Sequence, residues 1–358
     1  MFSIVTTQKI LEKLYSERSV WGDIIARTKC FYVKLDTEWW EEDDNALIEL
    51  SNSQANIING NDLFEEIEKH PEAIANYPTS VFILDIDENK ARQLQEKYGV
   101  IIQAVSHLDD SILTSVLPRK TFSMEEGENA AFGWREIFSG VKDLPSNSII
   151  INDRNLFTND EIVKDKDGVI IDKHLLGVDS IFNILNEALP QKLDIPFHVL
   201  IVCDKTGIEG DGMRRRKSIT VKNVITYLNG LKKHLNRPFP IVMELLAVCP
   251  GSSFFPATHN RRILTNYGLL TFEHKVNAFK GRMNNASQLI SVNKLFSHEN
   301  LKTENDPPFL FEHNRITKAL HKYLSYLNTT TVFSEHEFAK NGKAGLRFIE
   351  TEHRMIIY

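Results

Sequence analysis

Apolar and polar positions follow different spacings in successive parts of this chain, and each spacing predicts a type of element. In residues 1–78, the stretches "TQKILEKLYSE" and "DLFEEIEKH" place apolar side chains at helical intervals. The stretch "TKCFYVKL" between them could form a strand. The pattern therefore predicts that residues 1–78 form an N-terminal helical segment, with at most a short strand inside it.

From Thr79 onward, short apolar runs alternate with helical patterns. "TSVFILDI" and "VIIQAV" are typical of buried strands, and "DENKARQLQEKYG" between them is typical of a helix with an acidic start and a glycine stop. The same order returns later, with "FHVLIVCDK", the helical "SITVKNVITYLNGLKKHLN" and "FPIVMELLAV". Strands joined by a helix pair in parallel, so two strand–helix–strand units are predicted.

A similar polar motif follows each unit. The two motifs share one spacing and a threonine directly before the last asparagine, and they are Asn152-x-Arg154-x₄-Asn159 and His259-x-Arg261-x₄-Asn266. This repetition predicts an internal duplication, and hence an α/β protein of two similar halves with mostly parallel sheets flanked by helices. The expected divisions are the helical segment 1–78, a first half 79–195, a second half 196–290, and a C-terminal part 291–358 with a helix and two closing strands in "KAGLRFIET" and "EHRMIIY".

The paired motif resembles the His-x-Lys-x₄-Asp motif that occurs twice in the phospholipase D-like superfamily. In that family the two motifs meet at one phosphodiester site, where one histidine attacks phosphorus and the other protonates the leaving oxygen. The resemblance covers roughly residues 80–290, and it places His259, Arg261 and Asn266 at the family's His, Lys and Asp positions. Asn152, Arg154 and Asn159 take the corresponding positions in the first motif.

The departures from the family motif favour binding over catalysis. Asn152 does not titrate and cannot act as a nucleophile, and Asn266 gives His259 no negative charge. Arginine retains the positive charge of lysine and adds a planar fork that suits phosphate. We therefore expect a catalytically degenerate protein in which Arg154 and Arg261 clamp a phosphate, with hydrogen bonds from His259, Asn152, Asn159 and Asn266. The resemblance implies nucleic acid as the ligand and, by analogy, a component of a bacterial multi-protein system of the defence type.

Three alternatives stay open from the sequence. The chain could be an active phosphodiesterase or nuclease, using either His259 or a metal ion held by Asp85 and Asp204 at two strand ends. It could instead be a noncatalytic scaffold that binds a partner protein. The motifs could also be polar strand ends in which asparagine serves only turn geometry.

Composition narrows the range of ligands and locations. The formal net charge of −6 means that nucleic-acid binding needs a local basic patch. The densest basic run, "MRRRKS" at 213–218, is a candidate. The stretch "FEHKVNAFKGR" adds His274, Lys275, Lys280 and Arg282 downstream of the second motif, but it lacks the Gly-Ser-x-Asn element found there in the family, which argues further against activity. No nucleotide-binding or metalloprotease motif is present, so no cofactor is expected. The three cysteines are widely spaced, which argues against disulfides or zinc. No secretion signal or membrane span is visible, so we expect a cytoplasmic protein without membrane association.

Overall fold

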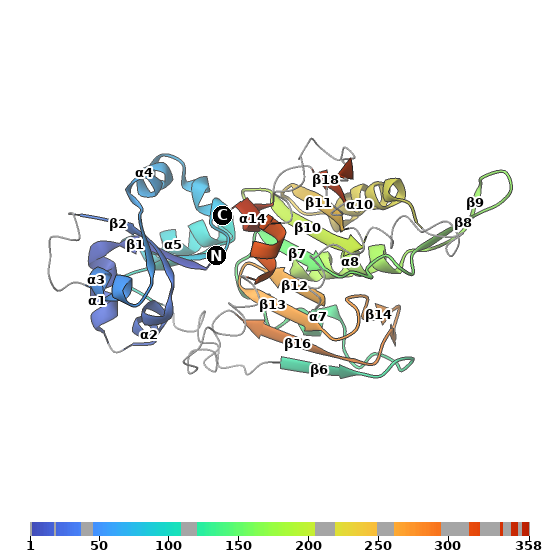
Figure 1. Cartoon of the computed structure of the whole chain (residues 1–358), viewed down its shortest axis with the longest axis horizontal. Coiled ribbons are helices and arrows are strands. Elements are labelled where there is room, and N and C mark those ends of the chain that lie inside the picture. The colour runs from blue at the N-terminus through green and yellow to red at the C-terminus, as the bar shows by residue number, and fades with distance from the viewer. Residues whose placement is uncertain are drawn as a thin grey trace.

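The computed structural model describes residues 2–17, 19–36, 46–108, 120–204, 219–248, 261–294, 315–322, 337–338, 345–349 and 353–357. These residues form a five-stranded sheet, a nine-stranded sheet and two separate two-stranded hairpins, with helices around both large sheets. The α/β class is therefore confirmed. Figure 1 shows the five-stranded sheet at one end of the long axis and the nine-stranded sheet at the other.

The five-stranded sheet is entirely parallel and has the strand order β3-β2-β1-β4-β5. Its strands are β1 (Ser3–Thr7), β2 (Cys30–Lys34), β3 (Asn56–Asn59), β4 (Ser80–Leu84) and β5 (Ile101–Ala104). The strand expected in "TKCFYVKL" is β2. The prediction that 1–78 is a separate helical segment is wrong, because β1, β2 and β3 lie within it and share a sheet with β4 and β5. The sequence pattern did not reveal this sheet, because its first three strands are short and lie between stretches with stronger helical patterns.

Helices connect the strands of this sheet. They are α1 (Gln8–Ser16), α2 (Val20–Arg27), α3 (Ala46–Asn52), α4 (Asn61–Lys69), the 3₁₀ helix η2 (Pro71–Asn76) and α5 (Glu88–Tyr98). The predicted limits of α5 are confirmed: Asp87 accepts a hydrogen bond from the Lys90 amide, and Gly99 ends the helix with φ of +62°. The chain winds to one side of β1 and then to the other, which is the order of doubly wound sheets.

The nine-stranded sheet is mixed, with the order β17-β18-β11-β10-β7-β12-β13-β16-β6. Its parallel centre consists of β7 (Ser148–Asn152), β10 (Phe197–Asp204) and β11 (Ile241–Val248). The remaining strands all pair antiparallel, and they are β6 (Lys120–Met124), β12 (Arg261–Thr265), β13 (Gly268–Phe272), β16 (Gln288–Lys294), β17 (Glu337–Phe338) and β18 (Gly345–Ile349).

The two sheets do not correspond to the two predicted halves. The expected first half, 79–195, is divided, because β4 and β5 lie in one sheet while β6 and β7 lie in the other. The expected second half, 196–290, adds β10 and β11 beside β7, so the strands before both motifs belong to one sheet. Both predicted strand–helix–strand units are parallel, as expected, but they are not two copies of one complete half.

The helices of the larger sheet are α7 (Trp134–Phe138), α8 (Leu176–Ala188), α10 (Val221–Leu235) and the short α14 (Arg354–Ile357). In the C-terminal part, the expected helix is present over residues 315–322, and the strand expected in "KAGLRFIET" is β18, paired with β11. The second closing strand is wrong, because "EHRMIIY" contains α14. This segment is tethered by buried His353, whose Nε2 lies 3.0 Å from the Ile149 carbonyl oxygen.

The two large sheets meet at the beginnings of their parallel strands. Asn147, directly before β7, donates to the carbonyl oxygens of Tyr98 at 2.8 Å and Ala75 at 3.2 Å. Tyr267, in the turn between β12 and β13, donates to the Ser80 carbonyl and accepts from the Ile101 amide. We call this junction the seam. Because parallel strands start at the seam on both sides, their carboxyl ends point away from each other (Figure 1).

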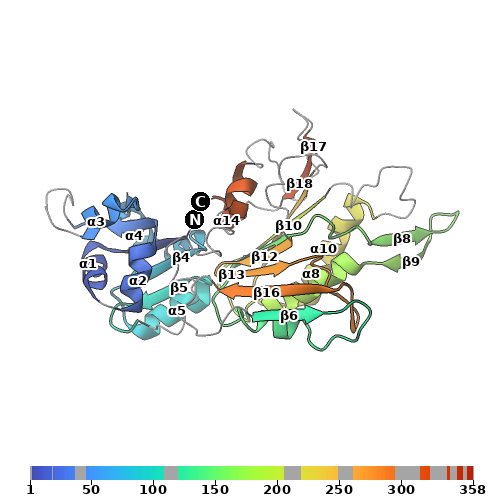
Figure 2. The same cartoon turned by 60° about the horizontal axis from the view of Figure 1, so that its bottom comes forward.

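Two hairpins extend from the larger sheet. The strands β8 (Glu161–Lys164) and β9 (Ile170–His174) form a hairpin, with Gly168 at φ of +81° in the turn between them. It projects from the body in Figures 1 and 2, whereas β14 (Phe279–Lys280) and β15 (Met283–Asn284) form a smaller hairpin near β13. Within the described residues, no helix has both the length and the apolar character needed to cross a bilayer.

Candidate functional site

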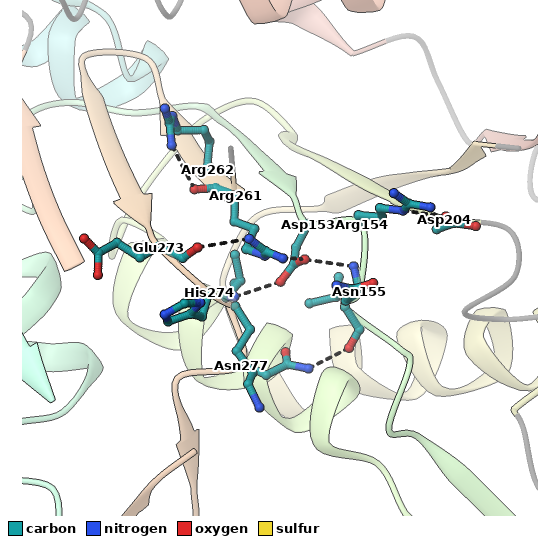
Figure 3. Close-up of polar contacts among 12 residues, drawn as sticks. Asp153, Arg154, Asn155, Asp204, Arg261, Arg262, Glu273, His274 and Asn277 are labelled. Atoms are coloured by element: carbon teal, nitrogen blue, oxygen red, sulfur yellow. Dashed lines mark hydrogen bonds and ion pairs between the residues drawn. The ribbon is translucent and has the colours of Figure 1, made fainter. Parts of the chain in front are cut away.

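Strand pairing brings the beginnings of the two sequence motifs to one end of the larger sheet. The strands β7 and β12 are antiparallel neighbours, and Asn152 at the end of β7 pairs with Arg262 near the start of β12. Arg154 follows β7 by two residues, and Arg261 is the first residue of β12. Both motif arginines therefore lie at the carboxyl end of β7, as Figure 3 shows.

The two motif arginines do not form the predicted clamp on one phosphate, because each is directed to its own carboxylate. The Arg154 Nε donates to Asp204 Oδ2 at 2.9 Å, and the Arg261 Nε lies 3.7 Å from Asp153 Oδ1. Side chains alternate between the faces of a sheet, so Arg261 projects to the opposite face from Arg262 and its partner Asn152. In Figure 3 the two guanidinium groups point in different directions.

Asp153 is the central buried acid of the site. Its two oxygens accept hydrogen bonds of 2.8 Å from the backbone amides of Val276 and Asn155. Burial raises the pKa of Asp153, while those two amides and the charges of Arg261 and Lys275 act in the opposite direction. Asp153 therefore fixes the segment around Val276 against the end of β7, and it holds Arg261 in place.

Cys203, at the end of β10, is buried next to the two site carboxylates. Burial and the neighbouring charges of Asp204 and Asp153 hold the pKa of its thiol well above the usual range. A thiol with a raised pKa carries little thiolate at neutral pH and is a poor nucleophile. Cys203 thus has the chemistry of a packing residue, as its apolar surroundings in the sequence indicate.

The loop after β7, residues 153–160, is held rigidly between two other elements. Asn277 donates to the Leu156 carbonyl oxygen at 2.6 Å from one side. On the other side, Asp160 accepts from the amides of Gly177 at 2.6 Å and Val178 at 3.2 Å, in the first turn of α8. Gly177 is needed here, because a Cβ would lie 2.4 Å from the Leu156 carbonyl oxygen.

A cavity of about 340 Å³ lies between the start of α8 and the β14–β15 hairpin. Three basic side chains line it: Lys173 and His174 at the end of β9, and Lys280 in β14. The partly buried rings of Phe182 and Phe279 also line it, together with Asp179. The Arg261 Nη1 donates to the Glu273 carbonyl oxygen at 3.0 Å, and Phe279, Lys280 and Gly281 line the cavity, so the segment 273–281 connects Arg261 to the cavity.

The remaining residues of the first motif have different environments. Asn152 is buried as the last residue of β7, whereas Asn159 is exposed on the loop 153–160. Asn159 is therefore available to a ligand at this end of the sheet. Its role in phosphate binding stays a prediction.

Asn266 lies at the opposite end of β12 from Arg261, at the seam. A strand rises roughly 3.3 Å per residue, so the five residues of β12 separate Asn266 from the site by about 16 Å. The Asn266 oxygen accepts from the Ser148 hydroxyl at 2.8 Å, and its amide donates to the Gly99 carbonyl at 2.9 Å. Asn266 does not lie at the site where it was expected to donate a hydrogen bond to phosphate, because residues 261–265 form a regular strand that places it at the seam. Asn266 is therefore a structural residue.

Asp85 and Asp204 cannot hold one metal ion, which corrects the proposed metal site. Asp85 follows β4 and Asp204 ends β10, and these strands run away from the seam in opposite directions. Among the described residues, no group of three or more histidine, cysteine, aspartate or glutamate side chains is arranged to hold a metal ion.

Two predicted features lie outside the described residues: His259, and the basic run 213–218. Asp153 was not among the predicted site residues, although it stands next to Asn152 in the first motif. The signal was present, since Asp153 and Asp204 both stand at the ends of neighbouring apolar runs. Lys173 and His174 were also not predicted, because they stand outside both motifs in the sequence.

No protein-family model matches this chain, and no curated protein is detectably similar to it in sequence.

Proposed function

We propose that this protein binds the phosphate groups of single-stranded nucleic acid without cleaving them. The binding element is a basic surface made of six side chains at the carboxyl end of β7: Lys173, His174, Arg261, His274, Lys275 and Lys280. The observation that carries the proposal is the cavity, which Lys173, His174 and Lys280 line together with two aromatic residues.

The composition of the basic surface fits an unpaired strand. Lys173, His174, His274 and Lys280 are exposed, so their positive or hydrogen-bonding ends are accessible to phosphate. Phe182 and Phe279 offer faces on which an unpaired base can stack, which a duplex cannot use. The nearby acids lie against basic groups of this surface: Asp153 is buried against Arg261, Asp179 lies close to Lys173, and Asp172 Oδ2 lies 3.2 Å from His174 Nε2.

We expect no cleavage of the bound strand because the motif residues lack the chemistry for it. Asn152 does not exchange protons near neutral pH, and Asp204 is committed to Arg154. Asp153 accepts two backbone hydrogen bonds and is fully buried. None of these groups is placed to activate water or protonate a leaving oxygen. Under this proposal, the chain shares with the phospholipase D-like superfamily the binding of phosphate but not its cleavage.

The double substitution Lys275→Gln/Lys280→Gln is expected to weaken binding of a fluorescent single strand about tenfold or more. If both side chains contact phosphates, the slope of log affinity against log salt should fall by about 1.4, at roughly 0.7 per contact. Fluorescence anisotropy between about 50 mM and about 200 mM salt measures both quantities. Lys9→Gln/Lys13→Gln is the matched control, because it removes the same charge from exposed positions on α1.

Equal weakening in the control and in the Lys275/Lys280 variant would show that only net charge matters and would reject the basic surface. Preference for duplex over single strand would reject the stacking role of the cavity. The same strands incubated with and without Mg²⁺ test the hydrolase alternative, which gains support if cleavage occurs and disappears in His259→Ala.

A scaffold function is the second candidate, and the β8–β9 hairpin favours it. Val169, Ile170 and Ile171 are 59%, 48% and 64% exposed on this projecting element. Among the described residues β9 pairs only with β8, so its other side offers unpaired backbone groups to another strand. Self-association between two such hairpins would cover the apolar side chains.

If the hairpin mediates self-association, sedimentation velocity should show a dimer that Ile170→Lys/Ile171→Lys converts to monomer. Met283→Lys, at a residue 47% exposed in the other hairpin, should leave the dimer intact. A wild-type protein that stays monomeric at every accessible concentration would remove this candidate.

A further inference from the structure

The seam contains a small cavity of about 40 Å³ that is separate from the basic surface. It lies at the beginnings of β1, β2 and β4 and is closed on one side by α14. Figure 1 shows α14 between the two sheets, beside the N terminus. Its lining includes Ser3, Tyr32, Tyr77, Thr79, Ser80 and Arg354.

Arg354 is the charged residue of this lining, and it is only 8% exposed. Its Nη1 is buried and makes no hydrogen bond to any described residue, and no described carboxylate forms an ion pair with it. Burial lowers the pKa of Arg354 to about 10, which leaves the guanidinium charged at neutral pH. An uncompensated buried charge is costly, and proteins normally pair it with an opposite charge.

The other lining groups can complete an anion site. Ser3 and Ser80 present hydroxyl groups whose oxygens are 2.6 Å apart, and Thr79 precedes Ser80. Hydroxyls donate hydrogen bonds to oxyanions, and arginine offers a planar fork to them. A single water needs roughly 10–15 Å³ on this measure of volume, so the cavity has room for one small ion.

We propose that this cavity binds a small oxyanion, through the Arg354 guanidinium and the hydroxyls of Ser3, Thr79 and Ser80. The ion would join the C-terminal segment 353–357 to the first residues of the five-stranded sheet. The site lies at the start of the strands, whereas the basic surface lies at the carboxyl end of β7. The proposed anion site is therefore independent of the proposed nucleic-acid binding, and a failure of one does not affect the other.

The test is thermal unfolding of the full chain at pH 7 in phosphate, acetate or chloride at equal ionic strength. Saturable binding of inorganic phosphate is expected to raise Tm by about 2–4 °C over chloride. A rise with acetate as well assigns the site to oxyanions in general, and a rise with phosphate alone assigns it to tetrahedral ions. Isothermal titration calorimetry with inorganic phosphate measures the binding directly.

Arg354→Met should abolish the anion-dependent part of the rise and leave Tm in chloride equal or higher, because it removes an unpaired buried charge. Arg92→Gln, at an exposed residue on α5, should behave as wild type and shows the general salting effect of phosphate. Arg354→Lys retains charge without the fork and should give a smaller rise.

Two results would overturn the proposal: no saturable rise in the wild-type protein, or an equal rise in Arg354→Met. The wild-type titration decides the matter alone if Arg354→Met does not fold.

Discussion

Replacing Asn266 with alanine is expected to lower the free energy of unfolding by about 4 kcal/mol, the largest effect of any substitution considered. Each buried polar group left without a partner costs roughly 1–3 kcal/mol. Asn266 is fully buried at the seam, and its side chain bonds to the loop before β7, to β7 itself and to the end of α5. Its partners are Ser146, the backbone and side chain of Asn147, Ser148 and the Gly99 carbonyl.

Urea denaturation of wild type and Asn266→Ala measures this loss. Asn159→Ala is the matched control, because Asn159 holds the same position in the first motif but is exposed, and its loss should fall within about 0.5 kcal/mol. Because Asn266 connects the two sheets, the variant should also unfold less cooperatively, with separate transitions for the two sheets. Equal losses in the two variants would contradict the structural role of Asn266 at the seam.

Acidification is expected to remove about 3 kcal/mol of stability through His353 as the pH falls from about 6.5 to about 4. Burial lowers the pKa of His353 from 6.5 to about 4, although its contacts with the carbonyls of Ile149 and His198 act in the opposite direction. In this interval the unfolded chain binds a proton that the folded protein does not, so stability declines as pH decreases. The neighbouring His198 ring, 6.0 Å away, and the Arg354 charge both lie close to this group.

Urea denaturation at a series of pH values, for wild type and His353→Gln, isolates this contribution. Glutamine can still donate to the two carbonyls but does not titrate, so the pH dependence of the variant should be shallower by about 3 kcal/mol over the interval. Other groups contribute equally to both proteins. Asp160, whose pKa burial raises to about 7, acts in the opposite sense and would otherwise mask the effect. Parallel curves for the two proteins would disprove the assignment.

Local patterns in the sequence predicted most elements of the fold. The helix α5 was predicted with both of its ends, because Asp87 and Gly99 are a capping residue and a helix stop that act within one turn. The strands β4, β5, β10 and β11 were predicted because each is a continuous apolar run, and their parallel pairing follows from the helices between them. These features depend on neighbours along the chain.

The arrangement of the candidate site depends on long-range pairing, and there the sequence was insufficient. The run "RILTNYGLLTF" does not show that Asn266 and Tyr267 form a turn between two antiparallel strands. Nor does it show that β12 lies beside β7, which places Arg261 near Asp153 and Asn266 at the seam. The equal spacing of the two motifs predicted equal roles for Asn159 and Asn266. The first motif continues into a loop, which keeps Asn159 at the carboxyl end of β7, whereas the second continues as the strand β12, which carries Asn266 to the seam.

The meeting of the two sheets at the starts of their strands also has a consequence for what the molecule can hold. In parallel α/β sheets, ligands are bound outside the carboxyl ends. Here those ends form two opposite tips of an elongated body, separated by the length of both sheets (Figure 1). Two ligands bound at these tips would be held at a fixed separation. The effects of substitutions at one tip should be additive with those of substitutions at the other.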